Sequence, residues 1–213
     1  MSSRYDSLTS IFTPEGRLLQ VENAIKNIVV GVGGLAADAN LLIDYSREYS
    51  QNYFFKYKSL TPLENVVKNI SDIMQMKTQF GSSRPYGAGF LFGGWDKNNG
   101  FQLYNTEPSG IYNAWRAHAI GKNDQSAQSS LKEYYDKDMS LEDGIKLAIK
   151  VLKKSLDKNK MSGENIEIMV LEKNEDGLNQ RFIKNDEISK YINIVDKEDE
   201  EEKLKEKKKK KDF

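Results

Sequence analysis

Two helical segments that follow each other directly, with strand-like segments after them, constrain the fold of this chain more than any other feature. Residues 38–57 and 61–80 carry apolar side chains at helical spacing. Residues 86–120 read as strands interrupted by turn-forming sequences at 96–100 and 106–110. Because helices and sheets each bury an apolar face against another element, such segments pack as layers. The sequence therefore predicts an α+β fold in which helix pairs cover antiparallel sheets.

The second half of the chain repeats this order of helices followed by strands. Its predicted elements are helices at 124–135 and 141–156, strands at 166–172 and 180–183, and a short helix at 186–194. Ser140 stands at the N-cap of the second of these helices, with Asp143 at its third position, and Thr61 is a predicted N-cap in the first half. Residues 18–28 show the spacing of an amphipathic helix, and 29–32 read as a strand.

The composition excludes several classes of function. The chain has no cysteine, so thiol nucleophiles, disulfides and Cys-based zinc sites are ruled out. A Ser-His-Asp triad would have to use His118, whose place in a strand of alternating character favours a structural role. With 32 basic and 32 acidic residues the formal net charge is zero, which argues against a general nucleic-acid or membrane binder. The segment Gly31–Gly34 is not followed by the Lys-Ser/Thr of a phosphate loop, and no cofactor is predicted.

The sequence also carries no sign of a membrane or secretory destination. No apolar run approaches the roughly 20 residues that span a bilayer. The first ten residues lack the apolar core of a secretory signal. We therefore expect a cytoplasmic and nuclear protein.

Residues 196–213 differ sharply from the rest of the chain. They consist almost entirely of acidic residues and lysines, with Leu204 and Phe213 as the apolar exceptions. Such a segment cannot bury enough surface to offset its ordering entropy, so we expect a charged disordered tail. Lys207 to Lys211 are either a nuclear-import or polyanion-binding patch or part of a solubilising tail.

Several motifs, in order along the chain, closely resemble those of proteasome alpha subunits. In the N-terminal region the resemblance rests on Tyr5-Asp6 and on residues 12–18 and 20–22. Further matching motifs lie at 33–39, 78–81, 84–87, 108–110 and 119–121. The resemblance extends over residues 3–195.

This resemblance implies a fold and a division of the chain. The fold is a four-layer αββα sandwich of the N-terminal-nucleophile hydrolase type, and the α+β pattern agrees with it. Residues 1–17 would be an N-terminal gate arm, 18–195 the alpha-type domain and 196–213 the tail. Catalytic beta subunits use an N-terminal threonine whose own amine is the base. The first threonine here is Thr9, so the resemblance implies a non-catalytic subunit.

The resemblance also implies partners and a gate. Seven alpha subunits would form a ring stacked on a ring of beta subunits, with a regulatory particle or activators opening the entrance during ubiquitin-dependent protein degradation. The motif that orders the open arm corresponds to Tyr5, Asp6, Pro14 and Asn23. The Tyr5 hydroxyl and the Asp6 carboxylate can join a hydrogen-bonded cluster between arms, and Pro14 fixes the turn. Catalytic, metal and cofactor residues are not implied.

Two features depart from the family pattern. Asn23 stands where the family usually has a tyrosine, which predicts weakened gating. Between Ile28 and Val29 the family has a further few tens of residues that hold several strands and an activator-binding lysine. The count of about six strands is also few for two full sheets. We expect strands to be missing between Ile28 and Val29, which would expose sheet edges.

Two other functions stay open at this stage. One is a truncated or standalone interaction protein of the same fold, which does not enter a ring. The other is an active N-terminal-nucleophile amidohydrolase, for which Ser2 would become the first residue after removal of methionine.

Overall fold

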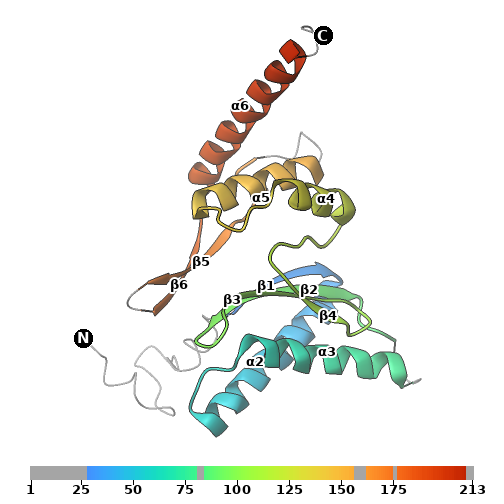
Figure 1. Cartoon of the computed structure of the whole chain (residues 1–213). Helices are drawn as coiled ribbons and strands as arrows, with labels where there is room; N and C mark the ends of the chain where they lie inside the picture. The colour runs from blue at the N-terminus through green and yellow to red at the C-terminus, as the bar shows by residue number, and fades with distance from the viewer. Residues whose placement is uncertain (1–27, 81–83, 156–161, 175–176, 210–213) are drawn as a thin grey trace. The chain divides into compact units, whose positions relative to one another are not determined.

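The protein is described here from a computed structural model. The structure describes residues 28–80, 84–155, 162–174 and 177–209, drawn in colour in Figure 1. The chain divides into two compact units, the first comprising Met1–Ile120 with Leu171–Gln180, and the second Gly121–Val170 with Arg181–Phe213. We describe these two units separately, and the single domain over residues 18–195 stays a prediction.

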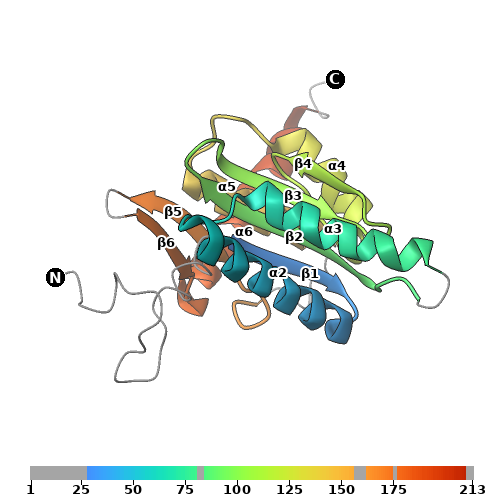
Figure 2. The same cartoon turned by 90° about the horizontal axis from the view of Figure 1, so that it is seen from below.

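A four-stranded antiparallel sheet is the centre of the first unit (Figure 2). Its strands are β1 (Ile28–Gly34), β2 (Ala88–Asp96), β3 (Gly100–Thr106) and β4 (Tyr112–Trp115), and they lie in this order across the sheet. The register pairs Val32 with Phe90, Phe92 with Tyr104, and Leu103 with Trp115. The side chains of β2 alternate between buried and half-buried, as expected for a central strand with unequal faces.

Two consecutive helices, α2 (Ala36–Tyr57) and α3 (Leu63–Gln79), cover one face of this sheet (Figures 1 and 2). The apolar stripe of α3 supplies Val67, Ile70 and Met74 to the core. These side chains share a cluster with Leu42 of α2 and with the inward side chains of β2. The helix pair predicted from the sequence is therefore confirmed, as is the α+β class with antiparallel sheets.

The hairpin predicted between β2 and β3 is also confirmed. The Asp96 carboxylate accepts hydrogen bonds from the backbone N–H groups of Asn98 and Asn99, at 2.9 and 2.7 Å. Gly100 then has a φ of +71°, which glycine adopts without strain. The turn chemistry of Asp96–Gly100 thus fixes the register of the two strands.

The second unit contains α4 (Asp124–Tyr134), α5 (Leu141–Ser155) and α6 (Asn185–Lys209). Strands β5 (Met169–Asn174) and β6 (Gly177–Phe182) form a two-stranded sheet, of which Leu171–Gln180 belong to the first unit and the outer ends to the second. The core of this unit consists of buried aliphatic side chains, namely Ile145, Ile149, Ile166, Val170, Ile183, Ile188, Ile192 and Val195. At the start of α5 the Asp143 N–H donates to Ser140 Oγ at 3.2 Å, and the Ser140 hydroxyl donates to the Asp143 carboxylate at 2.6 Å. The predicted N-cap at Ser140 is confirmed.

Helix α6 corrects the prediction for the C-terminal region. A short helix over 186–194 and a disordered tail from residue 196 were expected, but α6 continues to Lys209. The Lys153 ammonium on α5 forms ion pairs with Asp196 and with Asp199, the latter at 2.6 Å. Burial alone would lower the pKa of Lys153, but the hydrogen bonds to these carboxylates raise it. Asp196 and Asp199, two of the acidic residues that suggest a solvated tail, therefore fasten the helix to α5.

Three smaller predictions also need correction. Strand β4 ends at Trp115, not at residue 120, because its ladder with β3 ends at the pair Leu103–Trp115. Thr61 is not the N-cap of α3, since Pro62 occupies that position and the Thr61 hydroxyl donates to the Ser50 carbonyl at 3.3 Å. Ile28, expected at the end of a helix, is the first residue of β1. The arm, and the helix expected from residue 18, lie outside the described residues.

Gly110 provides a test of how the β3–β4 turn packs on α3. Its φ is +83°, and an added Cβ would lie 2.7 Å from the Ser71 carbonyl oxygen and 2.8 Å from the Gln75 nitrogen. A residue other than glycine in this left-handed backbone conformation costs about 1–3 kcal/mol. We expect Gly110→Ala to lower the free energy of unfolding of the first unit by more than this, because the added Cβ also collides with α3. Urea unfolding followed by tryptophan fluorescence measures this, because Trp95 and Trp115 both lie in this unit.

The matched control is Gly100→Ala. Gly100 also has positive φ, but an added Cβ there would meet nothing within 4 Å. The difference between the two variants isolates the collision with α3. Equal losses of stability would contradict the close packing of the turn on that helix.

Candidate functional site

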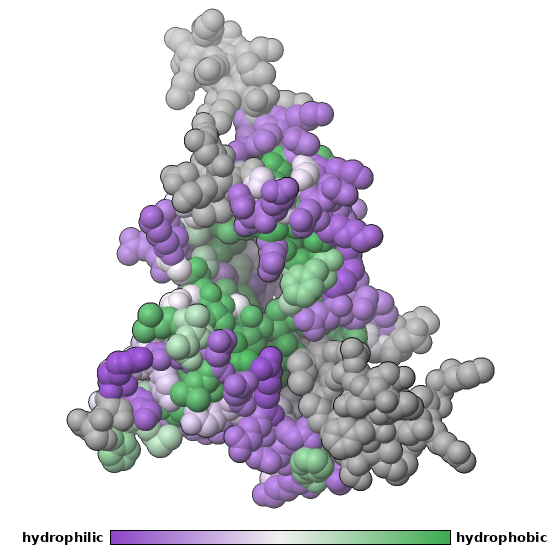
Figure 3. Space-filling model, turned by 180° about the vertical axis from the view of Figure 1, so that it is seen from behind, coloured by the Kyte–Doolittle hydropathy of each residue, from purple (hydrophilic) through white to green (hydrophobic). Residues whose placement is uncertain are grey.

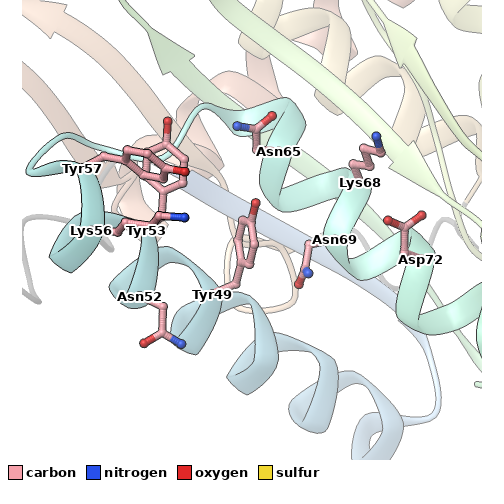
Figure 4. Close-up of a pocket in the computed structure, with 9 residues that line it drawn as sticks. All are labelled: Tyr49, Asn52, Tyr53, Lys56, Tyr57, Asn65, Lys68, Asn69 and Asp72. Carbon is pink, nitrogen blue, oxygen red and sulfur yellow. The ribbon is translucent and has the colours of Figure 1, made fainter.

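An open groove lies between α2 and α3, with a volume of about 530 Å³ (Figure 4). Its walls come from both helices. The lining residues are Tyr49, Asn52, Tyr53, Lys56 and Tyr57 from α2, and Asn65, Lys68, Asn69 and Asp72 from α3. Each set recurs at intervals of three or four residues, so each forms one face of its helix.

The groove exists because α2 uses only its first half to build the core. Its buried residues are Asp38, Ala39, Leu42 and Ser46. The remaining turns contain no buried side chain, yet they carry Tyr49, Tyr53 and Tyr57 on one face. Tyr49 and Tyr53 are half-buried, and Tyr57 is 54% exposed. An aromatic stripe in this position leaves apolar ring surface available to a partner.

The chemistry of the groove suits recognition of a polypeptide. The rings of Tyr53 and Tyr57 lie 4.5 Å apart at 45°, and the Lys56 ammonium lies 5.1 Å from the Tyr57 ring centre. Asparagine amides can both donate to and accept from a peptide backbone, and Lys68 and Asp72 add charges of both signs. The lining residues include no serine, threonine, cysteine or histidine.

The first turn of α2 is held by a buried carboxylate. Asp38 accepts two hydrogen bonds from the Arg84 guanidinium, at 2.7 and 2.9 Å, and a third from the Gly87 N–H at 2.8 Å. The bonds from Arg84, and then that from Gly87, lower the pKa of Asp38 to about 2. The Leu35 N–H also donates to the Gly87 carbonyl at 2.8 Å. This cluster joins the start of α2 to the segment that enters β2, and we interpret it as structural.

His118 has surroundings that fit the structural role predicted for it. Its ring stacks on Trp115 with the centroids 4.5 Å apart and the planes at 21°. The Trp115 indole N–H donates in turn to the Asn105 side chain at 2.8 Å, and Asn105 is buried. His118 therefore belongs to an aromatic pair at the end of β4, and not to a strand as the alternating pattern predicts.

The gate residues are predicted from the sequence but not described by the structure, whereas the groove is described by the structure but not predicted from the sequence. Tyr5, Asp6, Pro14 and Asn23 all lie outside the described residues, so their roles stay predictions. The sequence does not predict the groove, because the spacing over residues 38–57 indicates one apolar helical face without showing where the core ends. The signal that could have revealed the groove is a tyrosine at every fourth position, with asparagine and lysine in between. A helix face that packs in a core would more often carry aliphatic side chains at these positions.

Among the residues that the structure describes, no group of three or more histidine, aspartate or glutamate side chains could hold a metal ion. None of the helices in the same ranges is both long and apolar enough to cross a membrane.

Comparison with known proteins identifies the class to which this fold belongs. Residues 20–171 match the family described as "Proteasome subunit", and residues 5–26 match the N-terminal signature of the A-type subunits of that family. The chain belongs to the proteasome subunit family. The α+β fold predicted from the resemblance to N-terminal-nucleophile hydrolases agrees with this membership.

Within that family the chain is of the alpha type, and similar chains are named as alpha type-4 subunits of the proteasome. The one from Spinacia oleracea is 40% identical, over 79% of this chain and 85% of the relative. The Arabidopsis thaliana protein named alpha type-4-A is 38% identical over the same shares. The one from Dictyostelium discoideum is 34% identical, over 94% of this chain and 98% of the relative. Residues 94–97 and 100–104 resemble the same subtype.

The alignments also indicate that this chain is short within the matched region. The alignment with the spinach protein runs over 212 residues but takes in 79% of this chain of 213 residues, which is about 168. About 44 aligned positions of that relative therefore have no counterpart here. This supports the prediction of missing residues, and their place between Ile28 and Val29 stays a prediction.

The Asp38 cluster predicts a specific dependence of stability on pH. Because the pKa of Asp38 is lowered from 3.8 to about 2, its stabilisation is present above pH 3.8 and is lost as the pH falls toward about 2. We expect Arg84→Met to lower the free energy of unfolding near neutral pH. The difference between the variant and the natural chain should shrink toward pH 2. Urea unfolding between pH 2 and pH 7 measures both effects.

Arg47→Met is the matched control for this experiment. Arg47 pairs with Asp44 at 3.0 Å on the exposed side of α2, where ion pairs contribute about 0.2–1 kcal/mol. A loss of stability for Arg84→Met that stays constant across this pH range would contradict the role assigned to Asp38.

Proposed function

We propose that this protein is a non-catalytic alpha subunit of the proteasome core particle, which builds and gates the ring through which substrates enter. The observation that carries the proposal is the match to the proteasome subunit family over residues 20–171 together with the alpha N-terminal signature over 5–26. In this role the chain joins other alpha subunits in a seven-membered ring against a ring of beta subunits. It takes part in ubiquitin-dependent protein degradation in the cytoplasm and nucleus.

The groove between α2 and α3 is the proposed contact with a neighbouring subunit. It combines partly exposed aromatic rings with amides and charges of both signs, a mixture that favours polypeptide recognition. The half-buried Tyr53 lies at the centre of the stripe, and its ring contacts that of Tyr57 with the planes tilted by 45°. Aromatic side chains in such positions carry a large share of the binding energy in protein interfaces.

Co-purification tests both parts of this proposal. A tagged chain expressed in cells should bring down the other ring members and threonine peptidase activity, and it should elute far above 24.4 kDa in gel filtration. We expect Tyr53→Ala to reduce the recovered activity about tenfold, the effect of losing one interface anchor. Tyr45→Ala is the control, because Tyr45 lies on the same helix outside the groove.

The two parts can fail separately. A natural chain that recovers no peptidase activity and elutes near 24.4 kDa would contradict the ring proposal and favour a standalone protein. If the chain assembles but Tyr53→Ala behaves like Tyr45→Ala, the ring stands and the groove is not the contact.

The gate is the second proposed activity, and it rests on Tyr5, Asp6, Pro14 and Asn23. An asparagine at position 23 keeps hydrogen-bonding groups but lacks the ring of a tyrosine. We expect Asn23→Tyr to change the basal or activator-stimulated peptide hydrolysis of the assembled particle. Asn27→Tyr, the same change one helical turn further along the predicted helix, should not. Unchanged rates for Asn23→Tyr would count against this gating role.

A further inference from the structure

The outer edge of β1 is open in the part of the chain that the structure describes. In the sheet order β1–β2–β3–β4, strand β1 pairs with β2 on one side, and none of the described strands pairs on its other side. A strand in this position presents a row of backbone N–H and C=O groups that require partners. Figure 2 shows β1 at this margin of the sheet.

This edge lacks the features that normally protect an exposed strand. Its sequence, IVVGVGG, contains no charged residue and no proline. Its register with β2 is continuous from the pair Ile28–Gly94 to the pair Gly34–Ala88, so no bulge turns the edge away. The opposite edge strand, β4, has four residues against seven in β1, and shortness is itself a protection.

Apolar side chains accompany the open backbone. Val32 is 42% exposed and Leu35, directly after the strand, is 55% exposed. The view from behind in Figure 3 shows apolar surface, in green, at the level of this sheet. Association here would remove both unpaired backbone groups and apolar area from water.

We propose that β1 pairs antiparallel with β1 of a second copy of this chain, so that the two sheets join into one of eight strands. The strand is suited to pairing with itself, because an uncharged segment brings no like charges together across a two-fold axis. Gly31 and Gly33 carry no side chain that could obstruct a second strand paired alongside β1. This pairing does not depend on ring assembly and concerns the isolated chain.

Light scattering with gel filtration of the purified full chain over a range of concentrations tests the proposal. The natural chain should shift from 24.4 kDa toward twice that mass, and amides of β1 should become protected from hydrogen exchange as the concentration rises. Val32→Lys places a charge beside the edge, and we expect it to weaken the dimer at least tenfold. Leu41→Lys, an equally exposed apolar position on α2, should leave it unchanged.

Gly31→Lys is a second edge variant, whose added Cβ would meet Leu91 Cβ at an ordinary 3.6 Å. Circular dichroism establishes that each variant keeps the helix and strand content of the natural chain. The proposal would be overturned if the chain stayed a monomer at all concentrations. It would also be overturned if the protection of β1 amides from hydrogen exchange did not depend on concentration, because residues of the same chain would then cover the edge. Masses that grow beyond a dimer would also overturn it, since they require β1 to pair with another edge. Co-purification with ring members, measured in parallel, reports on the proposed function alone.

Discussion

The first unit is held together by every second side chain of β2, because these side chains point from the sheet toward helix α3. Ala88, Phe90 and Phe92 are buried, and the two phenylalanine rings lie 5.5 Å apart. Truncating a phenylalanine in such a core typically costs about 3–5 kcal/mol, a large part of the stability of a small domain. A register slip of one residue would turn all these side chains to the other face, so the core also fixes the pairing of β2 with both neighbours.

The rest of the first unit depends on this packing. With α3 fixed against β2, helix α2 needs contact with the core only through its first turns, and the Asp38 cluster fastens its start. The remaining turns of α2 then extend beside α3 without burying a side chain, and Tyr53 and Tyr57 line a groove. The groove is thus a consequence of a helix that is longer than the core beneath it.

The sequence predicted those elements whose causes are local. The turn at Asp96–Gly100 and the cap at Ser140 were found because each depends on residues within a few positions of each other. Helix α6 was cut short because its continuation depends on Lys153, which lies more than forty residues away from Asp196 and Asp199. Pattern reasoning sees a run of charges but not the partner that neutralises it. The groove was missed for the related reason that a periodic stripe does not reveal where the core beneath it ends.

The strands of the first sheet raise a question of assembly that goes beyond their own packing. The resemblance to proteasome alpha subunits places further strands before Val29, and about 44 positions of the spinach relative have no counterpart here. The outer edge of β1, which has no charged residue and no proline, lies where the resemblance leads us to expect further strands. A second copy that pairs with that edge would bind the folded chain and not the unfolded one, so the apparent stability would rise with the logarithm of the protein concentration. The proposed pairing of two copies would therefore link folding to association through the backbone of β1.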